Sequence, residues 1–192
     1  MDNHFDIPIL FLVFNRPETT KKVFNVIKGI KPTQLYIAAD GPREGNTSDH
    51  KKCAEVINFL EESLDWPCSV QWLKRNMNLG CGPAVSSAIS WFFENVDMGI
   101  ILEDDCLPHP FFFQFCKELL IKYKNNSHIT HINGYNCQNG IIRGNYSYYF
   151  SRYFYVWGWA TWKRAWRNYS YRLKNYETFI KEKVLLNIFN NK

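Results

Sequence analysis

Hydrophobic residues along the first 125 positions alternate between short unbroken runs and stripes with helical spacing. The run IPILFLVF (7–14) is continuously apolar, as expected for a strand buried on both faces of a parallel sheet. After it, Val23, Val26, Ile27 and Ile30 recur at i, i+3, i+4 and i+7, which is the stripe of an amphipathic helix. This pattern predicts a strand followed by a helix.

The same alternation repeats three more times. The further predicted strands are QLYIAA (34–39), CSVQWL (68–73) and GIIL (99–102). The apolar stripes of the helices that follow are Cys53, Val56, Ile57 and Leu60; Val85, Ala88, Ile89 and Phe92; and Phe112, Phe115, Cys116 and Leu119. Four strand–helix units in succession predict an α/β fold with a doubly wound, mostly parallel sheet.

Residues that favour helix starts precede the last three of these stripes. Ser48 can cap the second helix, and Pro83 fits the first turn of the third. Pro108 or Pro110 is expected to open the fourth helix.

Beyond residue 126 the pattern becomes less regular. HITHIN (128–133) is predicted as another strand, the aromatic stretch 145–162 as irregular or antiparallel structure, and 176–189 as a helix. The tryptophans expected to pack in the core or at an interface are Trp157, Trp159, Trp162 and Trp166. We therefore expect an aromatic, partly antiparallel C-terminal portion.

The composition is that of one folded domain, with 192 residues, 46% of them apolar and 21% charged. Acidic residues precede the short first apolar run, so we expect neither a secretory signal nor a membrane span, and a cytoplasmic location. The six cysteines lack CxxC spacing, which favours reduced thiols over disulfides or a zinc site.

The net charge of +5 is unevenly distributed. Residues 151–192 carry 9 basic and 2 acidic side chains, whereas the preceding 150 residues carry 14 and 16. Such a basic, aromatic segment can face nucleic acid or a membrane surface, or it can pack against another part of the protein.

Polar residues follow all four predicted strands, at the edge where open α/β sheets bind ligands. They are NRP (15–17), DGPR (40–43), RNMNLGCG (75–82) and the acidic triplet EDD (103–105). Arginine binds phosphate oxygens with a planar fork of donors, and Mg²⁺ or Mn²⁺ takes carboxylate oxygens together with ligand phosphates. The sequence therefore predicts a site for a phosphate-bearing ligand and a divalent metal.

The acidic triplet is the most informative of these segments. Acidic triplets are commonly solvated turns, but this one directly follows a buried-looking strand at the ligand edge, which favours a metal. Because side chains alternate along a strand, we expect Glu103 and Asp105 on one side and Asp104 on the other. His109 nearby is more typical of a helix terminus than of a ligand.

Plain structural interpretations stay open for the other candidates. Arg16 could be an exposed residue at a helix start, Asp40-Gly41-Pro42 is a good turn sequence, and Asn133-Gly134 is either a turn or part of the site. The chain contains neither GxGxxG nor GxxxxGK[ST], which argues against a dinucleotide dehydrogenase and a P-loop nucleotide hydrolase.

Taken in order, several segments resemble the GT-A glycosyltransferase superfamily of nucleotide-diphospho-sugar transferases. The segments are IPILFLVFNRPETTKKVFNVI, YIAADGPR, NLGCGPAVSSAISWFFENVDMGIILEDDCLPHPFFFQFC, HINGYN and YVWGWATWKRAWR. They resemble most closely the bacterial hemolytic protein-like transferases, and more distantly N-acetylglucosaminyltransferase I. The resemblance covers nearly the whole chain, and its most specific element is ILEDD followed by a Pro-Phe-Phe helix.

The resemblance implies a GT-A fold and roles for the residues at the predicted edge. The triplet resembles the DxD-type metal motif, in which Asp105 would bind Mn²⁺ (or Mg²⁺) at the diphosphate, while Glu103 and Asp104 would contact the ribose and donor sugar. The other donor-binding residues implied are Asn15, Arg16 near the diphosphate, Asp40 near a base that is commonly uridine, and Asn78 and Gly80 in the loop beside the nucleotide.

The activity implied is that of an inverting, metal-dependent glycosyltransferase, which passes a sugar from a UDP-sugar to a hydroxyl of a glycan or other acceptor. In the resembling enzymes the catalytic base follows the Gly-Trp segment, where this chain offers only Glu177 and Glu182. We therefore expect a single domain over 1–192, in which 1–125 bind the donor and 126–192 begin an acceptor half that is incomplete, with the base beyond residue 192.

Two other classes of function stay open. One is a non-catalytic module that binds a sugar nucleotide or a glycan. The other is a basic-aromatic binder of nucleic acid or of a membrane surface centred on 152–172, which would show steeply salt-dependent binding. We expect a nucleotide sugar and a hydroxyl acceptor as partners and no nucleic acid, while peripheral association with the inner membrane stays open.

Overall fold

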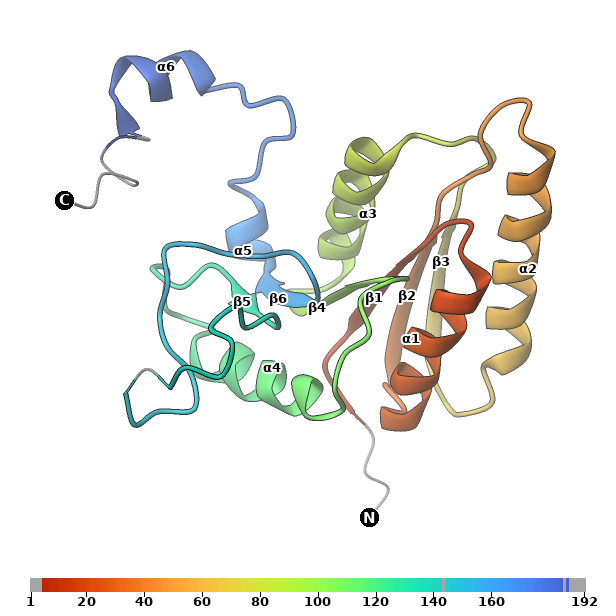
Figure 1. The fold of residues 1–192 in the computed structure, drawn as a ribbon, viewed down its shortest axis with the longest axis horizontal. Helices are drawn as coiled ribbons and strands as arrows, with labels where there is room; N and C mark the ends of the chain where they lie inside the picture. The colour runs from red at the N-terminus through yellow and green to blue at the C-terminus, as the bar shows by residue number, and fades with distance from the viewer. Residues whose placement is uncertain (1–4, 143, 185, 187–192) are drawn as a thin grey trace.

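The computed structural model describes residues 5–142, 144–184 and 186, which form an α/β fold around a six-stranded sheet (Figure 1). The strand order is β3-β2-β1-β4-β6-β5. The elements are β1 (Ile9–Val13), α1 (Pro17–Ile30), β2 (Gln34–Ala39), α2 (Thr47–Ser63), β3 (Ser69–Lys74), α3 (Cys81–Asn95), β4 (Met98–Glu103), α4 (Phe111–Lys122), β5 (Ile132–Asn133), β6 (Trp159–Trp162), α5 (Lys163–Trp166) and α6 (Tyr176–Lys181). Strands β1 to β4 pair in parallel and β6 runs antiparallel to β4 and β5, so the predicted mostly parallel α/β sheet is confirmed.

Helices cover both faces of the sheet. Helices α1, α2 and α4 bury their apolar stripes in one core, which contains Phe113 of α4 and in which Phe11 of β1 stacks near Phe24 of α1. Helix α3 forms the second core on the opposite face through Ala88 and Phe92. Figure 1 shows α1 and α2 side by side beside the parallel strands, and α6 standing apart from the sheet.

The helix starts predicted from prolines are found in the structure, whereas the start predicted from Ser48 is not. Pro17 opens α1, Pro83 lies in the first turn of α3, and Pro110 directly precedes α4. The cap of α2 is Asn46, whose side-chain oxygen accepts a hydrogen bond from the backbone N–H of Asp49 at 3.1 Å. Ser48 lies within the first turn of α2, so the predicted Ser48 cap is wrong.

The second half of the sheet is shorter than the sequence indicates. The predicted strand 128–133 is reduced to β5, and two carbonyl groups that precede β5 accept hydrogen bonds from side chains instead. Arg164 Nη2 donates to the carbonyl oxygen of Ile129 at 2.9 Å, and Thr161 Oγ1 donates to that of Thr130 at 2.6 Å. The aromatic stretch supplies the antiparallel strand β6, as predicted.

The predicted helix 176–189 is represented by α6, and residues 185 and 187–189 lie outside the described residues. In the described part of the chain, no helix has the length and apolar character needed to cross a membrane.

The register of the central strands determines which polar residues meet. Leu12 of β1 pairs with Glu103 of β4, and Val13 of β1 pairs with Ala39 of β2. The residues that directly follow these three strands therefore emerge at one edge of the sheet, as the strand–helix pattern predicts.

Candidate functional site

The acidic triplet ends β4, and part of its charge is offset by a side chain of the protein. Nη1 of Arg16 lies 3.0 Å from Oδ1 of Asp104 and 2.7 Å from Oδ2 of Asp105. Asp104 is buried, and its Oδ2 accepts a hydrogen bond from the backbone N–H of Phe14 at 3.1 Å. The carboxylate of Asp104 therefore ties the end of β4 to the loop after β1.

The two aspartates share Arg16, whereas alternation along a strand predicts that they point to opposite sides. β4 ends at Glu103, and Asp104 and Asp105 form a turn that closes with a 3.1 Å hydrogen bond from the N–H of Cys106 to the carbonyl oxygen of Glu103. Alternation applies only to extended backbone. The predicted separation of Asp104 from Asp105 is therefore wrong.

Burial and the neighbouring negative charges raise the pKa values of Glu103 and Asp104. Burial raises the pKa of Glu103, and the negative charges of Asp105 and Asp104 raise it further. Burial also raises the pKa of Asp104, against the opposing hydrogen bond from the Phe14 amide and the charge of Arg16. Three carboxylates thus face one guanidinium, so an additional cation would stabilise their ionised forms.

Asp105 is exposed enough to contact a ligand. Among the described residues, no three His, Cys, Asp or Glu side chains are grouped to hold a metal ion by themselves. Mg²⁺ commonly uses one or two carboxylates together with substrate phosphates, and Mn²⁺ shares its preference for oxygen ligands. The side chain of Asp105 is 47% exposed, and its Oδ1 faces the weak thiol donor of Cys106 at 3.8 Å. Asp105 could therefore hold Mn²⁺ or Mg²⁺ together with a bound diphosphate.

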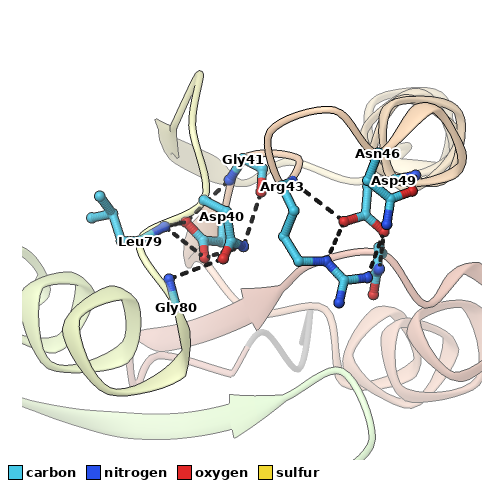
Figure 2. Close-up of polar contacts among 9 residues, drawn as sticks. Asp40, Gly41, Arg43, Asn46, Asp49, Leu79 and Gly80 are labelled. Carbon is cyan, nitrogen blue, oxygen red and sulfur yellow. Dashed lines mark hydrogen bonds and ion pairs between the residues drawn. The ribbon is translucent and has the colours of Figure 1, made fainter.

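A second group of predicted residues gathers after β2 and β3. Figure 2 shows Asp40 turned toward the loop that precedes α3, where its carboxylate accepts hydrogen bonds from the N–H of Leu79 at 3.1 Å and from Nδ2 of Asn78 at 2.8 Å. Oδ1 of Asn78 in turn accepts from the N–H of Gly80 at 3.1 Å. Gly80 has a φ of 79° at the start of α3, a backbone conformation that favours glycine. Asp40, Asn78 and Gly80 thus lie together, with Asp40 fastening the loop.

A third group includes two residues that are not among the site residues expected from the sequence. Asp49, in the first turn of α2, is buried and accepts hydrogen bonds from Nε of Arg43 at 2.5 Å and from Nη2 of Arg43 at 2.9 Å (Figure 2). Nδ2 of Asn15 donates to the same carboxylate at 2.7 Å. The hydrogen bonds from Arg43, then those from Asn15, hold the pKa of Asp49 far below its usual value.

Although Arg43 is paired with Asp49, its guanidinium is exposed enough to contact a ligand. Its side chain is 56% exposed, and its guanidinium carbon lies 5.8 Å from the centroid of the Phe14 ring. Arg43 follows β2 in the DGPR segment, so a signal for it exists in the sequence. Asp49 carries no such signal, because an acidic residue in a first helical turn is ordinary.

Two other arginines are engaged in holding the fold. Nη2 of Arg75, after β3, donates to Oγ of Ser87 in α3 at 2.8 Å. In the basic C-terminal segment, Arg164 donates to the carbonyl oxygens of Tyr123 and Lys124 at the end of α4. The 9 basic and 2 acidic side chains of residues 151–192 give that segment a net charge of +7. Arg164 is one of these basic residues, and its hydrogen bonds within the fold explain its position without an anionic ligand.

The tryptophans of the aromatic stretch differ in their exposure. Trp159 and Trp162 are buried, as expected. Trp157 is 57% exposed, so of the two expected settings, the core and an interface, the core is excluded for this residue. Gly158, with a φ of 69°, separates the exposed Trp157 from strand β6. His131 stacks on Trp159 with ring centroids 4.7 Å apart, and burial lowers its pKa to about 4.

Two hollows lie on the second half of the fold. One, of about 470 Å³, borders Asp105 and is lined by Trp157 among other residues. The larger, of about 570 Å³, lies among residues 128–155 with part of α4 and is lined by neither the acidic triplet nor the arginines Arg16 and Arg43. The smaller one is therefore the more relevant to the candidate site.

No protein-family model matches the chain, and no curated protein matches it in sequence. Among solved structures, it is similar to the mannosyltransferase PcManGT from Pyrobaculum calidifontis, which was solved in complex with GDP-Man and Mn²⁺. The TM-score is 0.42 and the sequence identity is 11%. The similarity covers 66% of this chain but only 34% of the mannosyltransferase chain.

Proposed function

We propose that this chain binds a nucleotide-diphospho-sugar and belongs to a metal-dependent, inverting glycosyltransferase that transfers the sugar to a hydroxyl acceptor. The observation that carries the proposal is the convergence of Arg16, Arg43 and Asp105 at the carboxyl edge of one parallel sheet. This edge is where open α/β sheets bind ligands. The resemblance of the same segments to GT-A enzymes supports the proposal.

Each group of residues has a distinct part in this proposal. The half-exposed guanidinium of Arg43, fixed by Asp49, donates to phosphate oxygens of the nucleotide. The loop fastened by Asp40 and Asn78 shapes the side of the site where the base, which we expect to be uracil, is bound. Arg16 holds Asp105 at the position where the diphosphate meets the acid cluster.

The reaction replaces one bond at the anomeric carbon with another. An acceptor hydroxyl attacks that carbon from the face opposite the diphosphate, its proton passes to a base, and the nucleoside diphosphate leaves. A Mn²⁺ or Mg²⁺ ion on Asp105 would supply positive charge to the departing phosphates. Glu177 and Glu182 lie in or next to α6, which stands apart from the strand ends (Figure 1), so we assign the base to neither.

Calorimetric titration of UDP and GDP, with and without Mn²⁺, tests the proposal. We expect Mn²⁺-dependent binding that weakens at least tenfold in Asp105→Asn, because metal–phosphate contacts are worth several kcal/mol. Asp97→Asn is the matched control, since Asp97 is an exposed acid that precedes β4 at its opposite end. Equal affinity in wild type and Asp105→Asn would contradict the proposal.

A transfer assay separates an enzyme from a binding module. Mn²⁺-dependent release of the nucleoside diphosphate from a nucleotide sugar, increased by an acceptor, is expected of the enzyme. Binding of the nucleotide sugar without release would favour a non-catalytic module. Salt-sensitive binding to DNA, RNA or anionic vesicles that Asp105→Asn leaves unchanged would favour the basic-aromatic binder.

A further inference from the structure

The chain that follows α5 and includes α6 exposes many large side chains that the donor site does not use. We call residues 167–183 the 167–183 segment. Its exposed aromatic and aliphatic side chains, each between 41% and 64% exposed, are Tyr169, Tyr171, Leu173, Tyr176, Phe179 and Ile180. A concentration of exposed apolar side chains of this kind marks an interaction surface.

The first residues of the 167–183 segment are anchored on the fold. The ring of Tyr169 stacks on that of Trp166 in α5, with centroids 4.2 Å apart and planes at 14°. Tyr171 lies against the first turn of α3, where a Cβ on Gly82 would come 2.5 Å from the tyrosine hydroxyl oxygen. The start of the segment is therefore held to both α5 and α3.

The rest of the 167–183 segment extends away from the sheet. In the part of the chain that the structure describes, the hydrogen bonds of residues 172–183 join members of the same segment. The N–H of Phe179, for example, donates to the carbonyl oxygen of Asn175 at 3.0 Å. Figure 1 shows α6 standing apart from the sheet, and α6 buries none of its residues. Its apolar side chains therefore face solvent rather than a core of the fold.

The basic side chains of the 167–183 segment are available to an anionic partner. All five are exposed, against two acidic residues in the same segment, and they are Arg167, Arg172, Lys174, Lys181 and Lys183. Within the described residues, the ion pairs of the protein involve other side chains. A second copy of this chain is an unfavourable partner, because two such segments would repel each other.

The aliphatic side chains favour a lipid surface over a nucleic acid. Tyrosine rings can stack on bases, but Leu173 and Ile180 have no ring to stack. At a bilayer, both aromatic and aliphatic side chains enter the boundary between headgroups and acyl chains, while Lys and Arg are attracted to anionic headgroups. The mixture of side chains in the 167–183 segment fits this boundary.

We propose that the 167–183 segment docks the protein on a bilayer that contains anionic lipids. Its apolar side chains enter the headgroup region, and its basic side chains lie at the lipid phosphates. Because Tyr169 and Tyr171 fix the start of the segment to α5 and α3, the α/β fold is held at the bilayer. This docking is a function in addition to the proposed donor site and does not depend on it.

Cosedimentation of the full chain with vesicles tests the proposal. The vesicles consist of phosphatidylcholine alone, or of phosphatidylcholine and phosphatidylglycerol in equal amounts. We expect binding to the mixed vesicles that weakens as the salt concentration rises, and much weaker binding to phosphatidylcholine alone, because the anionic headgroups attract the basic side chains.

Two variants separate the contribution of charge from that of apolar contact. The double variant Arg172→Glu/Lys174→Glu is expected to weaken binding to the mixed vesicles about tenfold or more, because two attractions to the anionic surface become repulsions. Leu173→Ser keeps the charge and is expected to weaken binding about threefold or more, because an apolar side chain no longer enters the bilayer. Circular dichroism of each variant establishes that a loss of binding is not a loss of fold.

Matched controls change the same properties elsewhere on the surface. Lys51→Glu/Lys52→Glu reverses two exposed charges on α2, which lies at the other end of the molecule from α6 (Figure 1). Ile121→Ser removes an aliphatic side chain of α4 that is 54% exposed. Both controls should bind the mixed vesicles as wild type does.

Several results would overturn the proposal. One is that wild type does not bind the mixed vesicles, and another is that the controls lose as much affinity as the variants they match. Tighter binding to single-stranded RNA than to the mixed vesicles, unchanged in Leu173→Ser, would identify a nucleic acid as the partner. A dimer in light scattering that Leu173→Ser disperses would identify a second copy.

Titration of UDP with Mn²⁺, without vesicles, keeps this proposal apart from the proposed function. Wild type that binds UDP but not the mixed vesicles overturns the docking alone. Wild type that binds the vesicles but not UDP supports the docking and refutes the donor site. Binding of both supports both proposals, so vesicle binding favours a purely basic-aromatic binder only where UDP binding is absent.

Discussion

The buried carboxylate of Asp49 receives two hydrogen bonds from the half-exposed guanidinium of Arg43, at 2.5 and 2.9 Å. A two-point contact of this kind fixes the orientation of the guanidinium as well as its position. Asp49 itself is anchored by the first turn of α2 and by Asn15, so the loop after β1, the loop after β2 and α2 meet at one carboxylate. Both the stability of the fold and the binding of a ligand should depend on this pair.

Replacing Asp49 by Asn is expected to lower the free energy of unfolding at neutral pH. The pKa of Asp49 is depressed in the folded state, so its stabilising contribution is present above the pKa of an unfolded Asp, about 3.9, and is lost as the pH falls through the lower folded pKa. Urea denaturation of wild type and Asp49→Asn should therefore differ clearly at neutral pH and converge in strong acid.

Asp65→Asn is the control for this experiment. Asp65 pairs with Lys28 at 2.7 Å on the surface, where an ion pair contributes little. A loss of stability in Asp65→Asn as large as that in Asp49→Asn would contradict the importance of the buried pair.

Asp104 is expected to show the opposite dependence on pH. Its pKa is raised by burial, so the contribution of its protonated form is fully present below the unfolded pKa of about 3.9 and is lost as the pH rises through the folded pKa. The stability of wild type relative to Asp104→Asn should therefore fall between acid and neutral pH. Denaturation midpoints at a series of pH values measure this, and a pH-independent difference would show that the burial of Asp104 does not control its ionisation.

Arg43→Lys is expected to weaken binding of a nucleoside diphosphate about tenfold, because lysine keeps the charge but lacks the planar fork that Asp49 orients. Calorimetry with UDP and Mn²⁺ measures the change. Arg167→Lys, at an exposed position directly after α5, serves as control. Unchanged affinity in Arg43→Lys would place the phosphates away from Arg43.

The tryptophans of the aromatic stretch should respond differently to the same substitution. Trp162 is 2% exposed, and its Nε1 donates to the carbonyl oxygen of Leu120 at 3.0 Å. Trp162→Phe leaves that carbonyl unpaired and opens a cavity, at a cost of about 2–3 kcal/mol. Trp157→Phe should change stability by about 0.5 kcal/mol or less. Chemical denaturation compares the two, and equal losses would mean that exposed Trp157 is as important to the fold as buried Trp162.

The parallel half of the fold could be predicted because its apolar runs are sharply bounded. QLYIAA, flanked by Pro32-Thr33 and by Asp40-Gly41, matches β2 residue for residue. Once the parallel units are recognised, their topology brings the polar ends of the strands together, which is why the candidate edge followed from the sequence.

The features of the site that could not be predicted from the sequence depend on contacts between segments that are distant in the chain. From the sequence, Asp49 is an ordinary surface acid in the first turn of a helix. Only the structure shows that Arg43 and Asn15, which come from other segments, donate hydrogen bonds to it. The turn at Asp104 ends the alternation that a continued strand would have kept. In the aromatic stretch, apolar residues without periodicity could not reveal that Trp157 is exposed whereas Trp162 is buried.

The position of β6 has a consequence for synthesis of the chain. β6 lies between β4 and β5 in the sheet, but the ribosome makes it after both. Until residues 159–162 emerge, the backbone groups along one side of β4 lack their strand partner, and such an edge can pair with other chains. At about 5–20 residues per second, this exposure lasts for several seconds of translation. During that interval, the unpaired side of β4 is a place where two nascent chains on one messenger RNA could join.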